Sequence, residues 1–521
     1  MDLRLTLDKE KQSIAFYSLR SPSDVGDLLE VKYGDLLYWL YRLPATRRYA
    51  TFQIKKRSRS TRLIEAPTAS IKILQQKLNQ VLQTVYRPKR CVHGFVEGRS
   101  VKTNALCHVR RRYVFNVDIK DFFHSINFGR VRGMFIAKPY NLPPKVATVL
   151  AQICCFNGRL PQGAPTSPTV SNMICGKMDS QLQRLSGVHR CTYTRYADDI
   201  TFSTSRRFFP TALASVNNLN QVEPGADLLE IISANGFSLH PDKVWLRRQD
   251  RRQEVTGVTV NEFPNVTRRF TNQIRAMLHA LETYGIDAAQ SDFEKIHDHK
   301  HRAPWSGRPS FKRVVKGKIE YLGMIKGKES STYLRCLDRL GRLAPEMVGE
   351  RGTPRELLLR RYDALVVSED PHGRGYLLQD LLRDTFRLFG VPVEKSFTRN
   401  EGGEQIDGAF QIEGFHYIVE CRWREKVADI RQVDGLLGQV LRSGAHAMGV
   451  FLSVNGWSEN VPLLLKQNRQ KVIILMDGND LKAVLSGTIT IRKLIEEKVK
   501  ELSIRAEPYL GVEAIFDRER S

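Results

Sequence analysis

Acidic residues at two places in the chain could together bind divalent metal ions. Asp118 lies near the end of the mostly apolar stretch Val114–Ile119, and the adjacent Asp198 and Asp199 lie between segments that alternate like strands. Adjacent carboxylates repel each other, and Mg²⁺ prefers a few carboxylates together with phosphate oxygens. If the fold brings Asp118 to the pair, the three could hold two ions that activate a hydroxyl group and stabilise a leaving pyrophosphate. An isolated Asp-Asp pair more often caps a turn, so the pair alone leaves both interpretations open.

A loop between the two acidic sites favours the metal-binding interpretation. It has the sequence LPQGAPTSP, from Leu160 to Pro168, and the second acidic site reads YADD. The Asp118 strand, the LPQG loop and the YADD turn, in this order, resemble the reverse transcriptases. The resemblance implies an α+β right-hand polymerase with fingers, palm and thumb. It also implies that Asp118, Asp198 and Asp199 are catalytic ligands of two Mg²⁺ ions.

The same resemblance assigns residues to the incoming deoxynucleoside triphosphate. Gln162 and Gly163 would line its pocket, and the ring of Phe123 would collide with a ribose 2′-hydroxyl. Arg62, with Lys56 close by, would contact the triphosphate, and Lys243 would help to protonate pyrophosphate. From the residues alone, a core position is the better interpretation of Phe123, and Arg62 and Lys243 could be solvated surface residues.

Two shorter patterns narrow the resemblance to retron reverse transcriptases. Asn104–His108 fits the pattern NAxxH before the Asp118 strand, Val255–Gly257 reads VTG after the palm, and His93–Ser100 also resembles that group. Retron enzymes use a dedicated structured non-coding RNA as template and primer, and begin DNA at an internal guanosine 2′-hydroxyl. The implied partners are that RNA, dNTPs, an RNA–DNA hybrid and a single-stranded DNA product. The implied RNA-binding residues are Asn104, His108, Val255, Thr256 and Gly257, although His108 could instead pack against a helix.

A second group of residues resembles the restriction-endonuclease-like superfamily, whose core pattern is D…(D/E)xK. Asp407 precedes a pair of strand-like segments, and Glu420 and Arg422 follow thirteen and fifteen residues later. The resemblance implies a nuclease site at these three residues that could bind Mg²⁺. Arg422 replaces the lysine of the pattern, and Gln379 replaces an acid often found on the first helix. Arginine stays protonated and does not act as a base, so an inactive binding module is the alternative.

The elements that must position these residues divide the chain into a polymerase and a smaller α/β domain. Helix-like spacing predominates before Tyr49, over Ser70–Tyr86, from about Thr169 to Leu185, and over Arg268–Tyr321. Strand-like alternation marks Tyr49–Glu65, Tyr113–Ile119 and Arg190–Ser205. The expected divisions are N-terminal helices, fingers and palm (1–267), thumb (268–345), linker (346–359), restriction-endonuclease-like domain (360–505) and C-terminal tail (506–521).

Charge and composition agree with a nucleic-acid enzyme. The net charge is +25, of which residues 1–359 carry +26 and residues 360–521 carry −1. Such an excess favours a polyanionic partner, although a solvated basic surface is the alternative. The eight cysteines form no CxxC pair, and neither a signal peptide nor a run of about 20 apolar residues is visible. We therefore expect a cytoplasmic bacterial protein without a membrane partner, and the oligomeric state stays open.

The pairing of the two domains suggests a role in bacterial defence against phage, with the C-terminal domain as effector. Two rival hypotheses remain at this point. One is a defence-associated reverse transcriptase that needs no retron RNA, and the other is a non-catalytic RNA-binding scaffold.

Overall fold

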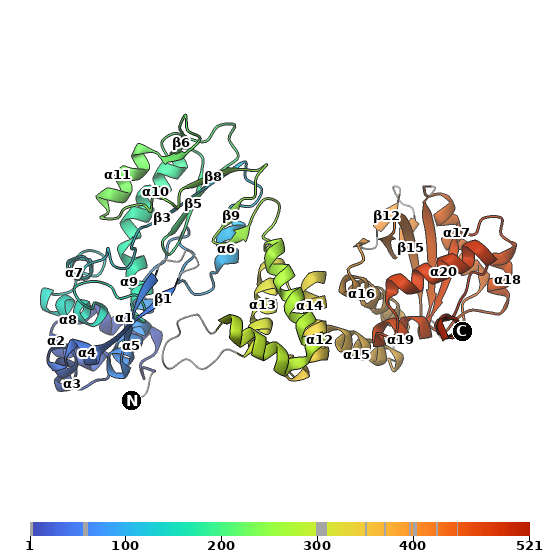
Figure 1. Cartoon of the computed structure of the whole chain (residues 1–521), viewed down its shortest axis with the longest axis horizontal. Coiled ribbons are helices and arrows are strands. Elements are labelled where there is room, and N and C mark those ends of the chain that lie inside the picture. The colour runs from blue at the N-terminus through green and yellow to red at the C-terminus, as the bar shows by residue number, and fades with distance from the viewer. Residues whose placement is uncertain are drawn as a thin grey trace. The chain divides into compact units, whose positions relative to one another are not determined.

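The computed structural model describes residues 4–55, 61–297, 310–349, 352–368, 371–394, 397–399, 404–423, 426–444 and 446–520. The chain forms two compact units (Figure 1). The first comprises residues 1–268 and 294–308, and the second comprises residues 269–293 and 309–521. No helix in the described ranges is long and apolar enough to cross a membrane.

An antiparallel sheet of four strands lies at the centre of the first unit. Its strands, in spatial order, are β4 (Thr192–Tyr196), β5 (Asp199–Thr204), β3 (Tyr113–Asp118) and β8 (Trp245–Arg248). Phe115 on β3 and Phe202 on β5 are fully buried and stack with their ring centroids 6.2 Å apart. The predicted strand and strand–turn–strand segments are therefore confirmed as β3, β4 and β5.

The N-terminal region is helical, as its pattern predicts, and leads into a hairpin. The helices are α1 (Lys9–Tyr17), α2 (Pro22–Leu28), α3 (Tyr33–Leu37), η1 (Tyr38–Arg42) and α4 (Ala45–Arg48). The hairpin consists of β1 (Tyr49–Lys55) and β2 (Thr61–Pro67), and α5 (Ala69–Val85) follows it. The apolar stripe of α5 is buried, which explains why this segment is a helix.

One predicted helix proves to be two. The segment from Thr169 to Leu185 contains α9 (Ser167–Ile174) and α10 (Gly176–Val188), which meet at Cys175. Cys175, with ψ −6°, is both the C-terminal cap of α9 and the N-terminal cap of α10. The prediction of a single helix was wrong because apolar spacing on both sides conceals a one-residue break. The other elements of this unit are α6 (Val101–Leu106), α7 (Phe128–Ile136), α8 (Pro144–Cys154), β6 (Ala214–Val216), β7 (Val222–Pro224), α11 (Ala226–Ala234), β9 (Glu254–Val255) and β10 (Val258–Thr259).

The second unit begins with a group of helices. They are α12 (Arg268–His297), which is interrupted at Gly285, then α13 (Phe311–Lys326), α14 (Ser331–Leu343), η2 (Pro345–Met347), α15 (Pro354–Val366) and α16 (Pro371–Phe389). Helix α14 packs against both α15 and α16. The segment expected to be a linker, residues 346–359, contains the start of α15, which Thr353 and Glu356 cap reciprocally.

A mixed five-stranded sheet forms the rest of the second unit. Its order is β11 (Val393–Glu394), β14 (Gly408–Ile412), β15 (Phe415–Arg422), β16 (Ala447–Ser453) and β17 (Ile473–Asp477), with β15, β16 and β17 parallel. The short strands β12 (Phe397–Arg399) and β13 (Glu404–Ile406) pair separately. The helices are α17 (Ile430–Leu441), α18 (Asn460–Gln467), α19 (Gly478–Ser486), α20 (Ile491–Arg505) and α21 (Val512–Arg520). Apolar clusters cover both faces of the sheet, as a parallel arrangement requires.

Candidate active site

The palm sheet brings the three predicted aspartates to one end. Strand β3 pairs with β5 in a register that places Asp118 opposite Asp199. The N–H of Ile119 donates to the carbonyl of Asp198 at 3.0 Å, and the N–H of His240 donates to the carbonyl of Asp118 at 2.8 Å. Backbone hydrogen bonds on both sides therefore fix the positions of all three residues.

The turn that carries Asp198 and Asp199 is supported by a buried ion pair. Arg195, which is fully buried, donates to both carboxylate oxygens of Asp179 at 2.8 Å. Its remaining nitrogen donates to the carbonyl of Ala197 at 3.0 Å, inside the turn. Because Ala197 has a φ of 57°, a backbone conformation that costs energy for a non-glycine residue, the turn needs such external support.

Burial and mutual repulsion both disfavour the charged form of the carboxylates in the site. Burial and the neighbouring carboxylates raise the pKa of Asp199 to about 7, and burial followed by Asp118 raises the pKa of Asp198. The Nζ of Lys243 lies 2.8 Å from Oδ2 of Asp118 and partly offsets this repulsion. Lys243 therefore has a partner in the site and is not merely a solvated lysine.

The three carboxylates suit Mg²⁺ in donor type, because they are oxygen ligands whose mutual repulsion a divalent cation would relieve. Lys243 already takes one oxygen of Asp118. Within the described ranges, no three acidic, histidine or cysteine side chains surround a common point as ion ligands. The site thus supplies the residues for metal binding, and its side chains must adjust to complete it.

The LPQG loop lies against strand β2 of the hairpin. The N–H of Glu65 donates to the carbonyl of Gln162 at 2.9 Å. Gly163 has a φ of 131°, and a Cβ there would lie 3.0 Å from the carbonyl oxygen of Glu65, so only glycine fits without displacement. The hairpin thus places exposed Arg62 on the strand beside this loop, and its charge offsets a small part of the rise in the pKa of Asp198. Lys56 lies outside the described residues.

Phe123 follows Asp118 in a tight turn and is half-buried. Its ring centroid lies 5.4 Å from that of Phe122 and 6.2 Å from that of Phe95, so neighbouring rings hold it in place. The next residue, His124, contacts Glu65 at 3.3 Å, which connects this turn to β2. Glu65 is buried and also contacts Arg159 at 3.5 Å. Nothing in the local sequence pattern singles out Glu65 as the residue that joins these segments.

The two patterns assigned to RNA binding meet in the structure, but mostly inside the protein. The Nδ2 of Asn104 donates to Oγ1 of Thr256 at 2.8 Å, which joins α6 to the turn between β9 and β10. Asn104 and Val255 are fully buried, whereas Thr256 is half-buried and Gly257 is exposed. RNA binding by this set stays a prediction, and the structure gives Asn104 an internal contact.

His108 is also internal. It is fully buried, with Nδ1 2.7 Å from Oγ of Ser203 and Nε2 2.7 Å from Oγ1 of Thr194. The histidine therefore joins β5 to β4 behind the YADD turn. Burial lowers its pKa from 6.5 to about 3, so His108 is neutral near pH 7.

Replacing His108 with leucine is expected to lower the free energy of unfolding by about 1–3 kcal/mol, because two buried hydroxyl groups lose a partner. The substitution should also change how the free energy of unfolding depends on pH. In the unfolded chain His108 takes up a proton below about pH 6.5, whereas in the folded protein it stays neutral until about pH 3. The stability of the wild type therefore falls as the pH is lowered through this window, and the stability of the variant falls less.

Denaturant titrations between pH 7 and 4 measure both effects. Equal pH slopes for His108→Leu and wild type would contradict the assignment, and His279→Leu on an exposed face is the control.

The comparisons with known proteins agree with this geometry. Residues 54–260 match the family model described as reverse transcriptase (RNA-dependent DNA polymerase). The retron Mx65 reverse transcriptase of Myxococcus xanthus is 37% identical over 337 residues, which cover 60% of this chain and 73% of that protein. This chain belongs to the retron reverse transcriptases. The retron Ec86 enzyme of Escherichia coli is 31% identical, covering 45% of this chain and 70% of its own length. The retron Mx162 enzyme of Myxococcus xanthus is 36% identical, and the alignment covers 44% of this chain and 52% of that protein.

This retron reverse transcriptase is an RNA-directed DNA polymerase, and its family depends on Mg²⁺ and uses RNA templates. The four-stranded sheet, the LPQG loop and strand β2 of the hairpin lie within the matched residues, whereas most of β1 precedes them.

The second candidate site of this retron reverse transcriptase lies in its other unit. Oδ2 of Asp407 accepts a hydrogen bond from the N–H of Cys421 at 3.1 Å, so Asp407 lies beside the end of β15. Arg422 forms ion pairs with Glu420 and with Asp407, the latter at 3.8 Å. Burial raises the pKa of Glu420. Gln379 lines a small cavity together with Asp407. The three predicted residues therefore do converge, with an arginine between two acids.

Proposed function

We propose that this enzyme copies a dedicated structured non-coding RNA, used as template and primer, into short single-stranded DNA joined to the RNA by a branch. The observation that carries the proposal is the similarity to the retron Mx65 reverse transcriptase across 73% of that protein. The hydrogen bond between Asn104 and Thr256 supports it, because it joins the two segments typical of retron enzymes.

The site residues take the following roles in this proposal. Asp118, Asp198 and Asp199 would hold two Mg²⁺ ions, which when bound would supply activation of the 3′-hydroxyl and charge stabilisation. Arg62 binds the triphosphate of a dNTP, while Gln162 and Gly163 line its pocket. Phe123 excludes the ribose 2′-hydroxyl. Lys243, now paired with Asp118, donates a proton to the leaving pyrophosphate.

The test is to express the gene within its native flanking DNA and to extract total nucleic acid. We expect a short DNA that becomes shorter after RNase treatment and is missing in the Asp198→Asn variant. If no such DNA forms, yet the purified enzyme extends an ordinary primer on RNA, the enzyme is a polymerase without retron RNA. If Asp198→Asn protects cells from phage as well as wild type does, a non-catalytic RNA-binding scaffold replaces this proposal.

We further propose that the C-terminal domain is a restriction-endonuclease-like effector that acts in defence against phage. The convergence of Asp407 and Glu420 at the end of β15 supports a single-metal nuclease site. One observation favours an inactive binding module instead: Arg422 already pairs with both acids, so these carboxylates have a cation without metal.

Replacing Asp407 with asparagine is expected to reduce nucleic-acid cleavage by the purified full chain at least about tenfold, since even residues outside the metal's ligand set contribute that much. The measurement is release of label from end-labelled DNA and RNA with Mg²⁺ or Mn²⁺. Asp434→Asn, an exposed acid on α17, is the matched control. Loss of phage protection in Asp407→Asn supports the effector role, whereas full protection by this variant refutes it.

A further inference from the structure

Glu65 is a buried acid at the meeting point of three segments that carry predicted nucleotide-pocket residues. Its side chain is 2% exposed and lies on β2, three residues after Arg62. Oε2 lies 3.3 Å from Nε2 of His124, the neighbour of Phe123, and Oε1 lies 3.5 Å from a terminal guanidinium nitrogen of Arg159. Burial of a charged group is costly unless the group is paired, so these two contacts stabilise the acid at this position.

The backbone of Glu65 binds the third segment, the LPQG loop. Its N–H donates to the carbonyl of Gln162 at 2.9 Å. The loop is in turn bound to the segment that follows Phe123, because the N–H of Leu160 donates to the carbonyl of Ile126 at 2.9 Å. Strand β2, the turn of Phe123 and the LPQG loop are therefore joined pairwise, and Glu65 takes part in the contacts of β2 with both of the others.

The β1–β2 hairpin needs such contacts, because a two-stranded sheet is only marginally stable by itself. At its open end, Tyr49 stacks on Phe156 with the ring centroids 4.0 Å apart. Glu65 lies farther along the hairpin, opposite Thr51, and gives it a second, polar attachment. Two attachments fix the direction of the hairpin as well as its position, so Glu65 helps to determine where the exposed side chain of Arg62 lies relative to the LPQG loop.

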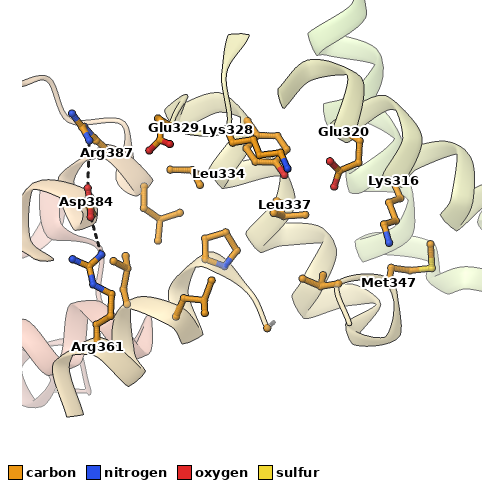
Figure 2. Close-up of a pocket in the computed structure, with 17 residues that line it drawn as sticks. Lys316, Glu320, Lys328, Glu329, Leu334, Leu337, Met347, Arg361, Asp384 and Arg387 are labelled. Carbon is orange, nitrogen blue, oxygen red and sulfur yellow. Dashed lines mark hydrogen bonds and ion pairs between the residues drawn. The ribbon is translucent and has the colours of Figure 1, made fainter. Parts of the chain in front are cut away.

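An acid with more than one cationic neighbour also occurs in the second unit, where it is more exposed. Asp384 pairs with Arg361 at 2.8 Å and with Arg387 at 3.4 Å, beside a cavity of about 390 Å³ (Figure 2). The side chain of Asp384 is 30% exposed, and both arginines are more exposed than that. Water screens such a group, so its contribution to stability is small. Asp384 is therefore a matched control for the buried Glu65.

We propose that Glu65 is a positioning residue that sets the preference of the polymerase for deoxyribonucleotides. Through His124 it holds the turn of Phe123, and through its backbone and Arg159 it holds the LPQG loop, so that ring and loop keep a fixed distance from β2. Contact with a single hydroxyl group is worth only about a hundredfold in selectivity, so a small movement of the pocket wall removes much of it. This inference rests on the pocket roles proposed above for Phe123 and Gln162, and it adds a residue that has no direct role in that scheme.

The test measures kcat and KM for a dNTP and for the matching rNTP while the purified full chain extends a primer on an RNA template. Glu65→Gln keeps the size of the side chain and removes its charge. We expect the ratio of kcat/KM for the dNTP to kcat/KM for the rNTP to fall at least about tenfold, with a higher KM for the dNTP. A purely structural role would lower kcat for both nucleotides alike, through loss of folded enzyme, and would leave this ratio and both KM values unchanged. Asp384→Asn should have the wild-type ratio.

Phe123→Ala separates this inference from the proposed function. Adding Glu65→Gln to Phe123→Ala should lower the ratio no further, because a residue that acts through another has no additional effect once the other is gone. Equal falls in both backgrounds overturn the inference. So does a wild-type ratio in Glu65→Gln together with a lowered ratio in Phe123→Ala, which leaves the proposed role of Phe123 intact. A wild-type ratio in Phe123→Ala refutes that role, and the inference with it.

A second variant keeps the test decisive if Glu65→Gln does not fold. Arg159→Gln leaves Glu65 and its contact with His124 in place and removes the more exposed partner. It should lower the ratio in the same direction and by less than Glu65→Gln. A wild-type ratio in folded Arg159→Gln then overturns the inference.

Discussion

Replacing Asp198 with asparagine is expected to abolish DNA synthesis, with a loss of at least about a hundredfold in rate. Asparagine keeps the size of the side chain and removes its charge. The backbone hydrogen bond from Ile119 to residue 198 does not involve the side chain, so the turn should persist. Substitutions outside a metal's ligand set already cost about 10–100-fold, and a ligand should cost more.

Primer extension on an RNA template by the purified enzyme measures this effect. Asp242→Asn is the control, because Asp242 is highly exposed and lies one residue from Lys243 without contacting the three aspartates. The midpoint temperature of thermal unfolding should be unchanged or slightly higher in Asp198→Asn, since a repelling charge is removed. Residual synthesis above one tenth of wild type would show that Asp198 is not a catalytic ligand.

Gly94→Ala is expected to have the second-largest effect, although Gly94 is not one of the predicted site residues. The segment that contains it runs beside β4: the N–H of His93 donates to the carbonyl of Arg195 at 2.8 Å. A Cβ at Gly94 would lie 2.5 Å from the backbone nitrogen of Ala197 and 3.0 Å from the carbonyl carbon of Tyr196. These are backbone atoms of the turn that carries Asp198 and Asp199, so the turn itself must move.

We expect DNA synthesis to fall at least about tenfold, since a misplacement of about 1 Å can cost a hundredfold. The free energy of unfolding should fall by about 1–3 kcal/mol, which is typical of overpacking. Gly133→Ala is the control, because a Cβ there meets no atom within 4 Å. Alanine should be neutral or stabilising in that helix. Wild-type activity in folded Gly94→Ala would show that the turn accommodates the methyl group.

The sequence predicts well which acidic residues lie together and poorly which residues support them, for a physical reason. Asp118, Asp198 and Asp199 lie at the ends of strands with strong local patterns, and antiparallel pairing brings them together. Arg195 and Asp179 are polar residues inside segments that otherwise look like core. Only the fold reveals that they form one buried ion pair under the turn.

The RNA-binding assignments show what a sequence motif does not predict. The NAxxH and VTG motifs are predicted to act together, and in the structure they do contact each other. A motif, however, does not indicate whether its side chains point outward. His108 and Asn104 satisfy buried groups, and this depends on residues some 90 and 150 positions away.

The hydrogen bond between Asn104 and Thr256 also defines what can be exchanged between related enzymes. Its donor and acceptor come from segments 152 residues apart, and Asn104 is fully buried. A chimera that takes one segment from a relative with a different partner residue would leave a buried amide without its hydroxyl, at a cost of about 1–3 kcal/mol. The two segments are therefore expected to covary through evolution and to be transplanted only as a pair.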